Sequence, residues 1–205
     1  MVEQRQRGLF PLPPDGFSAL PYDINNAGQT VGSLSVHTNA QEATTRAVLF
    51  QAETYVDLGT LPGGTFSVAS AISESGDVVG WSGLNFRGLD VRNPVHAFLY
   101  RDGQMTDLGT LRDHFISLAH DINSAGWVVG RSESSEDDGA AFLHVDGKMY
   151  DLNELVKGRS EWLLGSALGV NERGQIVGWG YVREEIRGFL LTPQHDLIPK
   201  PRQLQ

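Results

Sequence analysis

The chain contains no cysteine in 205 residues, which excludes disulfide bonds, a thiol nucleophile and cysteine-based zinc sites. Basic residues are also scarce: 16 Lys and Arg face 25 Asp and Glu, so the net charge is −9. This balance opposes binding to nucleic acid or to an anionic membrane surface. No apolar run reaches the length of a membrane-spanning helix, and no signal-peptide pattern follows the N-terminus. We therefore expect a soluble cytoplasmic protein, or a mature chain whose export signal was removed.

What the chain does contain is one phrase that occurs four times. Each copy starts at an aliphatic anchor residue, and successive anchors lie 48, 50 and 48 residues apart. The anchors are Ile24, Ile72, Ile122 and Val170. A period of this length is typical of supersecondary units that bury their apolar faces by stacking on one another. We expect a single domain over residues 1–205, with repeats at approximately 17–61, 66–111, 115–155 and 162–198.

After each anchor comes a turn of the form Asn/Ser-x-x-Gly, and then a short β-branched run that ends in glycine. The turns are 25–28, 73–76, 123–126 and 171–174, and the closing glycines are Gly32, Gly80, Gly130 and Gly178. An Asn or Ser side chain can hydrogen-bond the backbone of its own turn, and glycine supplies the positive φ at the exit. A glycine inside a strand indicates that another backbone approaches closely. Each copy is therefore expected to open with a β-hairpin.

A second hairpin completes each copy. Its first strand is a short apolar run such as Ala97–Tyr100, and in two copies Asp-Gly follows, a strong signal for a two-residue turn. The return strands end in Asp-Leu-Gly-Thr-Leu at 57–61 and 107–111, and in a divergent form at 151–155. Four-stranded antiparallel meanders at this period predict an all-β fold, a four-bladed β-propeller. An open β-solenoid is the alternative.

Two segments compete for the outer strand of the last blade. Residues 9–14 precede Phe17 in the way that residues 58–63 precede Phe66, so the N-terminus can supply this strand and latch the ring. Residues 195–198 are the second candidate, and the sequence supports both.

The run His96–Tyr100, followed by 107–111, resembles the bacterial HAF repeats, a family described as probable extracellular repeats. The likeness extends from about Phe17 to Leu191 and is greatest in the second repeat. Only His96 keeps the histidine of the family name. The resemblance implies a propeller-like repeat and export from the cell, and it implies no known activity.

A binding site is expected among loop positions that differ between the copies, because each blade needs the positions that are filled alike. In a meander, the connections between the second and third strands share one face with the linkers between blades. Those connections span 33–46, 82–96, 131–140 and 180–187. The candidate ligand-binding residues of this face are Arg46, Phe66, Arg92, His96, His114, Phe115, Trp162 and Arg187. They would form a cationic, partly aromatic rim for an anionic or sugar-like ligand. The alternative is that they hydrogen-bond or pack against adjacent blades.

An enzyme of the lyase, isomerase or cyclase type is the alternative function. His96, His114 or His120 would then act as general acid or base, with Asp113 orienting it. No spacing gathers the three or four ligands that a metal needs, so no metal and no other cofactor is expected.

The sequence favours a non-catalytic binding module over an enzyme. Its expected ligand is a carbohydrate, a small metabolite or a protein, and the expected state is a monomer or a small homo-oligomer. Neither nucleic acid nor membrane is expected as a partner. A scaffold that self-associates through an exposed apolar patch is a third hypothesis.

Overall fold

The computed structural model describes residues 9–39, 42–51, 54–83, 94–134, 139–156 and 161–194. These residues form fifteen strands and one short helix. The prediction of an all-β chain built from antiparallel sheets is thereby confirmed. Within the described ranges, no helix is long and apolar enough to cross a membrane.

The strands are grouped into successive antiparallel meanders, one for each repeat of the sequence. The first comprises β1 (Gly16–Ile24), β2 (Thr30–His37), β3 (Ala43–Gln51) and β4 (Thr54–Asp57). The second comprises β5 (Phe66–Ile72), β6 (Val78–Gly83), β7 (Val95–Arg101) and β8 (Gln104–Asp107). The third comprises β9 (Ile116–Ile122), β10 (Val128–Glu133), β11 (Ala140–Val145) and β12 (Lys148–Asp151), followed by helix α1 (Leu152–Leu155). The fourth comprises β13 (Trp162–Val170), β14 (Ile176–Val182) and β15 (Glu185–Leu191).

The Asn/Ser-x-x-Gly turns have the predicted chemistry. In the first turn, Asn25 Oδ1 accepts the backbone N–H groups of Ala27 (3.1 Å) and Gln29 (3.0 Å), and Gly28 has a φ of 77°. The turns also bind one another: Asn25 Nδ2 donates to the carbonyl of Ser73, 48 residues further on (3.1 Å). Asn123 Nδ2 donates in the same way to the carbonyl of Asn171 (3.0 Å), so the asparagines of the first and third turns also join their hairpins to the next meander.

The strand glycines lie where the sequence predicts a close backbone approach. A β-bulge in the first strand of the second meander brings its backbone toward Gly80, so that a Cβ there would lie 1.9 Å from the carbonyl oxygen of Val68. The equivalent oxygens lie 2.0 to 2.1 Å from a Cβ built at Gly32, Gly130 and Gly178. No side chain fits at that distance, which explains why all four copies carry glycine.

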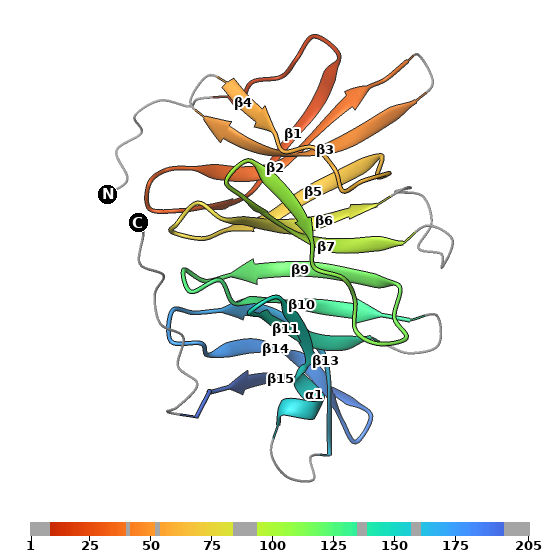
Figure 1. Ribbon diagram of the computed structural model, residues 1–205, viewed down its shortest axis with the longest axis vertical. Coiled ribbons are helices and arrows are strands. Elements are labelled where there is room, and N and C mark those ends of the chain that lie inside the picture. The colour runs from red at the N-terminus through yellow and green to blue at the C-terminus, as the bar shows by residue number, and fades with distance from the viewer. Residues whose placement is uncertain are drawn as a thin grey trace.

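The meanders follow one another along the long axis of the molecule, from β1–β4 at one end to β15 at the other (Figure 1). A buried apolar cluster fills each junction between neighbouring meanders. The first joins Val31, Ala47 and Leu58 to Ile72 and Val78; the second joins Val79, Ala97 and Leu108 to Ile122 and Val128; the third joins Val129, Ala141 and Leu152 to Val170 and Ile176. In the described part of the chain, no sheet or apolar cluster joins the fourth meander to the first.

Residues 1–8, which would form the strand of the predicted N-terminal latch, lie outside the described residues. After them, Phe10 lies on Phe50 of β3, with 4.4 Å between the ring centroids. The described part of the N-terminal segment thus contacts the first meander. The competing segment 195–198 lies outside the described residues.

Candidate functional site

His96 and Asp107 form the clearest titratable pair among the predicted site residues. His96 lies in β7, and its Nδ1 is 2.8 Å from Asp107 Oδ2 at the end of β8. Burial opposes the charge of the Asp107 carboxylate, but hydrogen bonds from His96 and the Gly109 N–H outweigh it and lower its pKa. The bond from the Gly109 N–H has an equivalent in the first repeat, where Asp57 Oδ1 accepts the N–H of Gly59. The carboxylate therefore shapes a turn that recurs in the repeat.

His120 lies at a junction between meanders. Its Nδ1 is 2.9 Å from the carbonyl oxygen of Ala167 in β13, so the neutral ring can donate a hydrogen bond to the fourth meander. Burial disfavours the imidazolium and lowers the pKa of His120, and the Ala167 carbonyl only partly offsets this effect. The residue acts as a cross-link between repeats.

Asp113, His114, Phe66 and Phe115 belong to the linkers or to the strands that follow them. Asp113 is exposed beside Arg112, with 3.5 Å between Arg112 Nε and Asp113 Oδ2. The His114 carbonyl accepts Thr110 Oγ1 at 2.9 Å, a bond that shapes the linker. Phe66 is buried in a cluster with Val95 and Ile116, and Phe115 packs against that cluster.

The remaining described candidates lie in the first and fourth meanders. Arg46 is half-buried in β3, and Trp162 packs against the cluster of the third junction from the start of β13. Arg187 forms an ion pair with Glu185 of its own strand. Arg92 lies outside the described residues.

The connection expected at 180–187 is not an irregular loop. β14 and β15 pair across it up to Val182 and Glu185, and the two residues between them, Arg183 and Glu184, have φ values of 51° and 66°. Such positive φ values at both positions are typical of a tight hairpin turn. The predicted rim is therefore incomplete at the fourth meander.

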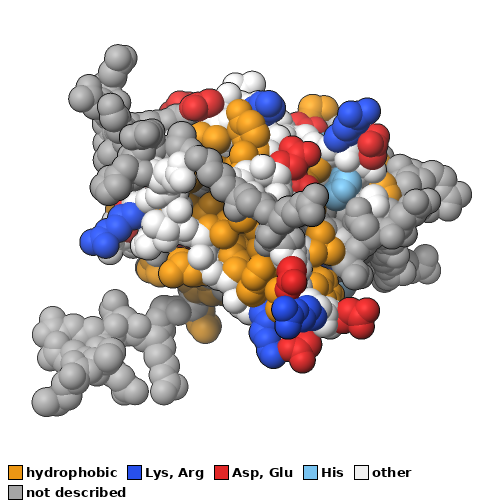
Figure 2. All heavy atoms as spheres, turned by 90° about the horizontal axis from the view of Figure 1, so that it is seen from below, with side chains coloured by type: hydrophobic (Ala, Val, Ile, Leu, Met, Phe, Trp, Pro, Cys, Tyr) orange, Lys and Arg blue, Asp and Glu red, His pale blue; other side chains and the backbone are white. Residues whose placement is uncertain are grey.

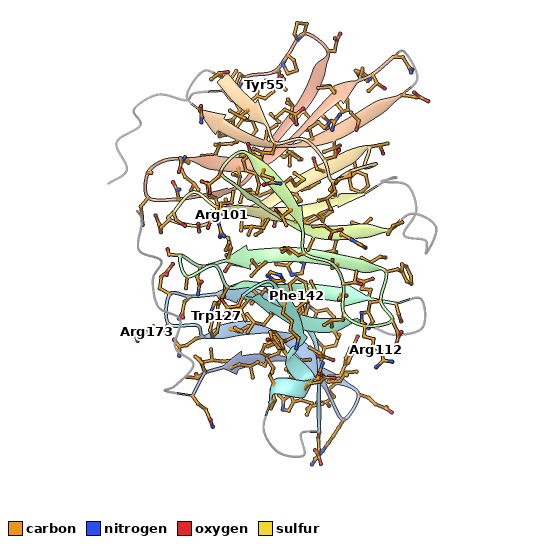
Figure 3. All side chains as sticks on the ribbon, in the orientation of Figure 1. Tyr55, Arg101, Arg112, Trp127, Phe142 and Arg173 are labelled. Atoms are coloured by element: carbon orange, nitrogen blue, oxygen red, sulfur yellow. The ribbon has the colours of Figure 1, made fainter. Side chains whose placement is uncertain are left out.

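The described residues also form two grooves that the sequence does not predict, each between neighbouring meanders. The 2–3 groove has a volume of about 410 Å³ and is lined by Leu99, Leu108, Gly126 and His144, together with charged residues of the two hairpins. The 3–4 groove has a volume of about 270 Å³ and is lined by the equivalent residues Leu143, Leu152, Gly174 and Leu191, together with Trp127, Leu155, Val156 and Pro193. Figure 3 labels Arg101 and Trp127, one from each groove.

The two grooves differ in polarity because the sequence differs at equivalent positions. The 2–3 groove contains Asp102, Asp107 and Asp146, and its Arg101 is already held by Asp77 through Nε (2.7 Å) and Nη2 (2.5 Å). Among the described residues that line the 3–4 groove, none is charged, and the polar side-chain groups are those of Thr192 and Gln194 and the indole N–H of Trp127.

Neither groove offers a metal site, and within the described ranges no group of three His, Cys, Asp or Glu residues is placed to hold an ion. His144 is nearly buried in the wall of the 2–3 groove, where burial lowers its pKa. At neutral pH this ring is therefore uncharged.

Comparisons with protein-family models, with curated proteins and with solved structures find no match to this chain. The resemblance to the HAF repeats therefore stays a prediction.

Proposed function

We propose that this protein is a non-catalytic binding module that holds an apolar side chain of a protein partner in the 3–4 groove. The observation that carries the proposal is the lining of this groove: Trp127, Leu143, Leu155, Val156 and Leu191 face one open cavity. Apolar side chains gathered at an open cavity favour a ligand that buries apolar surface there.

The lining favours a protein over the other two expected ligand classes. A carbohydrate needs several convergent hydrogen-bonding groups, whereas the described lining of this groove is mostly apolar and offers the side chains of Thr192 and Gln194 and the indole N–H of Trp127. Its volume of about 270 Å³ lies at the lower edge of cavities that enclose a whole metabolite. One large apolar side chain of a longer partner fits this size and polarity.

The edge of the fourth meander supports the same partner. In the described part of the chain, β15 pairs only with β14, whereas β3, β7 and β11 each carry a further outer strand. An unpaired edge beside an apolar groove can accept an extended segment by strand addition. Main-chain hydrogen bonds would then align the segment, and one of its side chains would enter the groove.

The test uses peptides selected from a display library on the full-length protein, with affinities measured by isothermal titration calorimetry. Leu155→Asp places a charge in the groove, and because Leu155 is 48% exposed, the fold is expected to persist. We expect this variant to weaken peptide binding about tenfold or more. Val56→Asp, at a partly exposed valine of β4, is the control. Selected peptides that bind Leu155→Asp as tightly as wild type would refute the proposed site.

The enzyme alternative rests on the His96–Asp107 pair, since a carboxylate that orients an imidazole is a common arrangement for a general base. It requires a substrate within reach of His96 Nε2. An activity lost in His96→Gln, at unchanged thermal stability, would support this second function.

The finer fold that the sequence predicts, a closed four-bladed propeller, would bring the fourth meander against the first, and it is the alternative to an open stack whose two ends meet other copies. The compartment is likewise a prediction: the sequence favours the cytoplasm, whereas the resemblance to the HAF repeats implies export from the cell.

A further inference from the structure

The two ends of the stack are apolar and uncovered in the described residues. Val31, Val79 and Val129 are equivalent residues of the first three meanders, and each is 0% exposed because the next meander covers it. Val177 holds the same position in the fourth meander and is 47% exposed. We call the surface of Val177, Leu168 and Leu190 the trailing end. Figure 2 views this end of the stack and shows hydrophobic side chains gathered on it.

The opposite end shows the complementary exposure. Ile72, Ile122 and Val170 are 4 to 8% exposed because the preceding meander covers them, whereas the equivalent Ile24 of the first meander is 64% exposed. We call the surface of Ile24 and Pro21 the leading end. The two ends are thus the two halves of one repeated junction, and they lie at opposite ends of the molecule (Figure 1).

We propose that the trailing end of one copy packs on the leading end of a second copy, in the manner of the junctions within the chain. Solenoid-like arrays normally end in repeats with a polar outer face, whereas the described residues at these two ends expose Val177, Leu168, Leu190 and Ile24. A contact between two different surfaces of identical chains is heterologous, so it generates rings or filaments.

Backbone hydrogen bonds at the junctions explain why the two ends match. The first junction contains a carboxylate cross-link, because the Ile72 N–H donates to Asp23 Oδ2 at 2.9 Å. The third junction has the equivalent bond, from the Val170 N–H to Asp121 Oδ2 at 2.7 Å. The second junction cannot have it, because Ala71 stands where the first meander has Asp23.

The second junction works without a carboxylate because the third meander supplies its own acceptor. The Ile122 N–H donates to Asp121 Oδ1 of the same strand, at 2.8 Å. The Ile24 N–H of the first meander likewise donates to Asp23 Oδ1, at 2.8 Å. The leading end therefore needs no acceptor from a preceding meander.

The trailing end offers none, because Gly169 stands at the position of Asp23 and Asp121. A junction between the fourth meander and a second copy's first meander is consequently of the same kind as the second junction. In such a junction the Ile24 N–H keeps Asp23 Oδ1 as its acceptor. Burying this N–H under a second copy therefore costs no hydrogen bond, and it does not oppose the apolar contact.

The N-terminal segment lies beside the leading end without covering Ile24. The Gly16 N–H donates to the Pro13 carbonyl at 2.9 Å, as the Gly64 N–H donates to the Leu61 carbonyl at 2.8 Å in the linker to the second meander. Phe10 covers Phe50, so residues 9–13 lie as the linker of a preceding meander would. The part left open around Ile24 is the part that a fourth meander would cover.

Sedimentation velocity of the full chain over a range of concentrations tests the proposal. Val177→Glu charges the trailing end and Ile24→Glu the leading end, at side chains exposed in the single chain. Val56→Glu is the matched control at another partly exposed valine. We expect wild type and Val56→Glu to form concentration-dependent oligomers, and each end variant alone to associate about a hundredfold more weakly or not at all.

An equimolar mixture of the two end variants provides the decisive measurement. Each variant retains one intact end, and the intact ends are complementary, so the mixture should form dimers and nothing larger. A wild-type chain that stays monomeric would overturn the proposal in either of two ways. If both end variants then lower the melting temperature, the chain closes on itself as a ring. If neither changes it, the ends do not meet at all.

Discussion

The equivalent valines of the four meanders allow one structural position to be compared in two environments. Val79→Ala removes two methyl groups from a side chain that is 0% exposed. Their transfer from water contributes about 0.8 kcal/mol each, and the cavity left behind raises the expected loss to about 2 to 3 kcal/mol of unfolding free energy. Val177→Ala makes the same change where the side chain is 47% exposed. Because water fills the space, its expected cost in a single chain is below about 1 kcal/mol.

Urea unfolding, followed by circular dichroism at concentrations where sedimentation shows monomers, measures both values. The comparison between the two valines is internal, because residue type, strand position and deleted atoms are the same. A loss of about 2 to 3 kcal/mol in monomeric Val177→Ala would refute the reasoning, since it would require Val177 to be covered within its own chain. At concentrations that allow association, Val177→Ala should instead weaken the oligomer.

Three further predictions concern single residues of the repeat. Gly80→Ala should prevent folding or lower the free energy of unfolding in urea by more than about 3 kcal/mol, because the new Cβ would overlap the Val68 carbonyl oxygen. Gly188→Ala is the matched control and should be nearly neutral, since a Cβ at Gly188 comes no closer than 3.7 Å to another atom. The free energy of unfolding should fall as the pH drops below about 6.5, because histidines of the unfolded chain then take up protons while the buried His120 stays neutral. In His120→Gln, the melting temperature should therefore depend less on pH in this range. A melting temperature that falls with pH as steeply as in wild type would contradict the role of burial. Arg101→Met should cost about 2 kcal/mol in chemical unfolding because it leaves Asp77 without its charged partner, and a neutral result would show that water replaces the arginine.

Local structure was predictable because the chemistry that forms it lies within a few residues. Asn25 and Gly28 shape their turn without help from the rest of the chain, and the alternation of apolar runs with turns indicates the meanders. Gly80 was predictable too, since a glycine that interrupts a β-branched run weakens the strand unless a neighbouring backbone needs the space.

The arrangement of the meanders was harder to predict, and the physical reason lies in the repeat itself. Val177 and Ile24 have the residue types of their buried equivalents, so the sequence pattern of a closed ring and that of an open stack are the same at both ends. Closure depends on the angle between successive meanders, which many small contacts at each junction determine together.

The grooves escaped prediction for a related reason. Leu143 and Leu152 occupy positions that are filled alike in several repeats, and a position filled alike is expected to serve the framework of the blade rather than a site. The exchange of His144 for Leu191 at equivalent positions was the one available signal for an apolar groove.

The alternating aspartates also restrict how this chain can change in length. Deleting the third meander alone would place Ala71 against Val170, whose N–H would lose the acceptor that Asp121 provides. Deleting the second and third together would place Asp23 there and restore the bond. Loss of the second meander alone leaves every one of these donors satisfied, because the Ile122 N–H keeps Asp121 Oδ1 as its acceptor. The carboxylates therefore make the third meander, rather than the second, the one that this chain should not lose by itself.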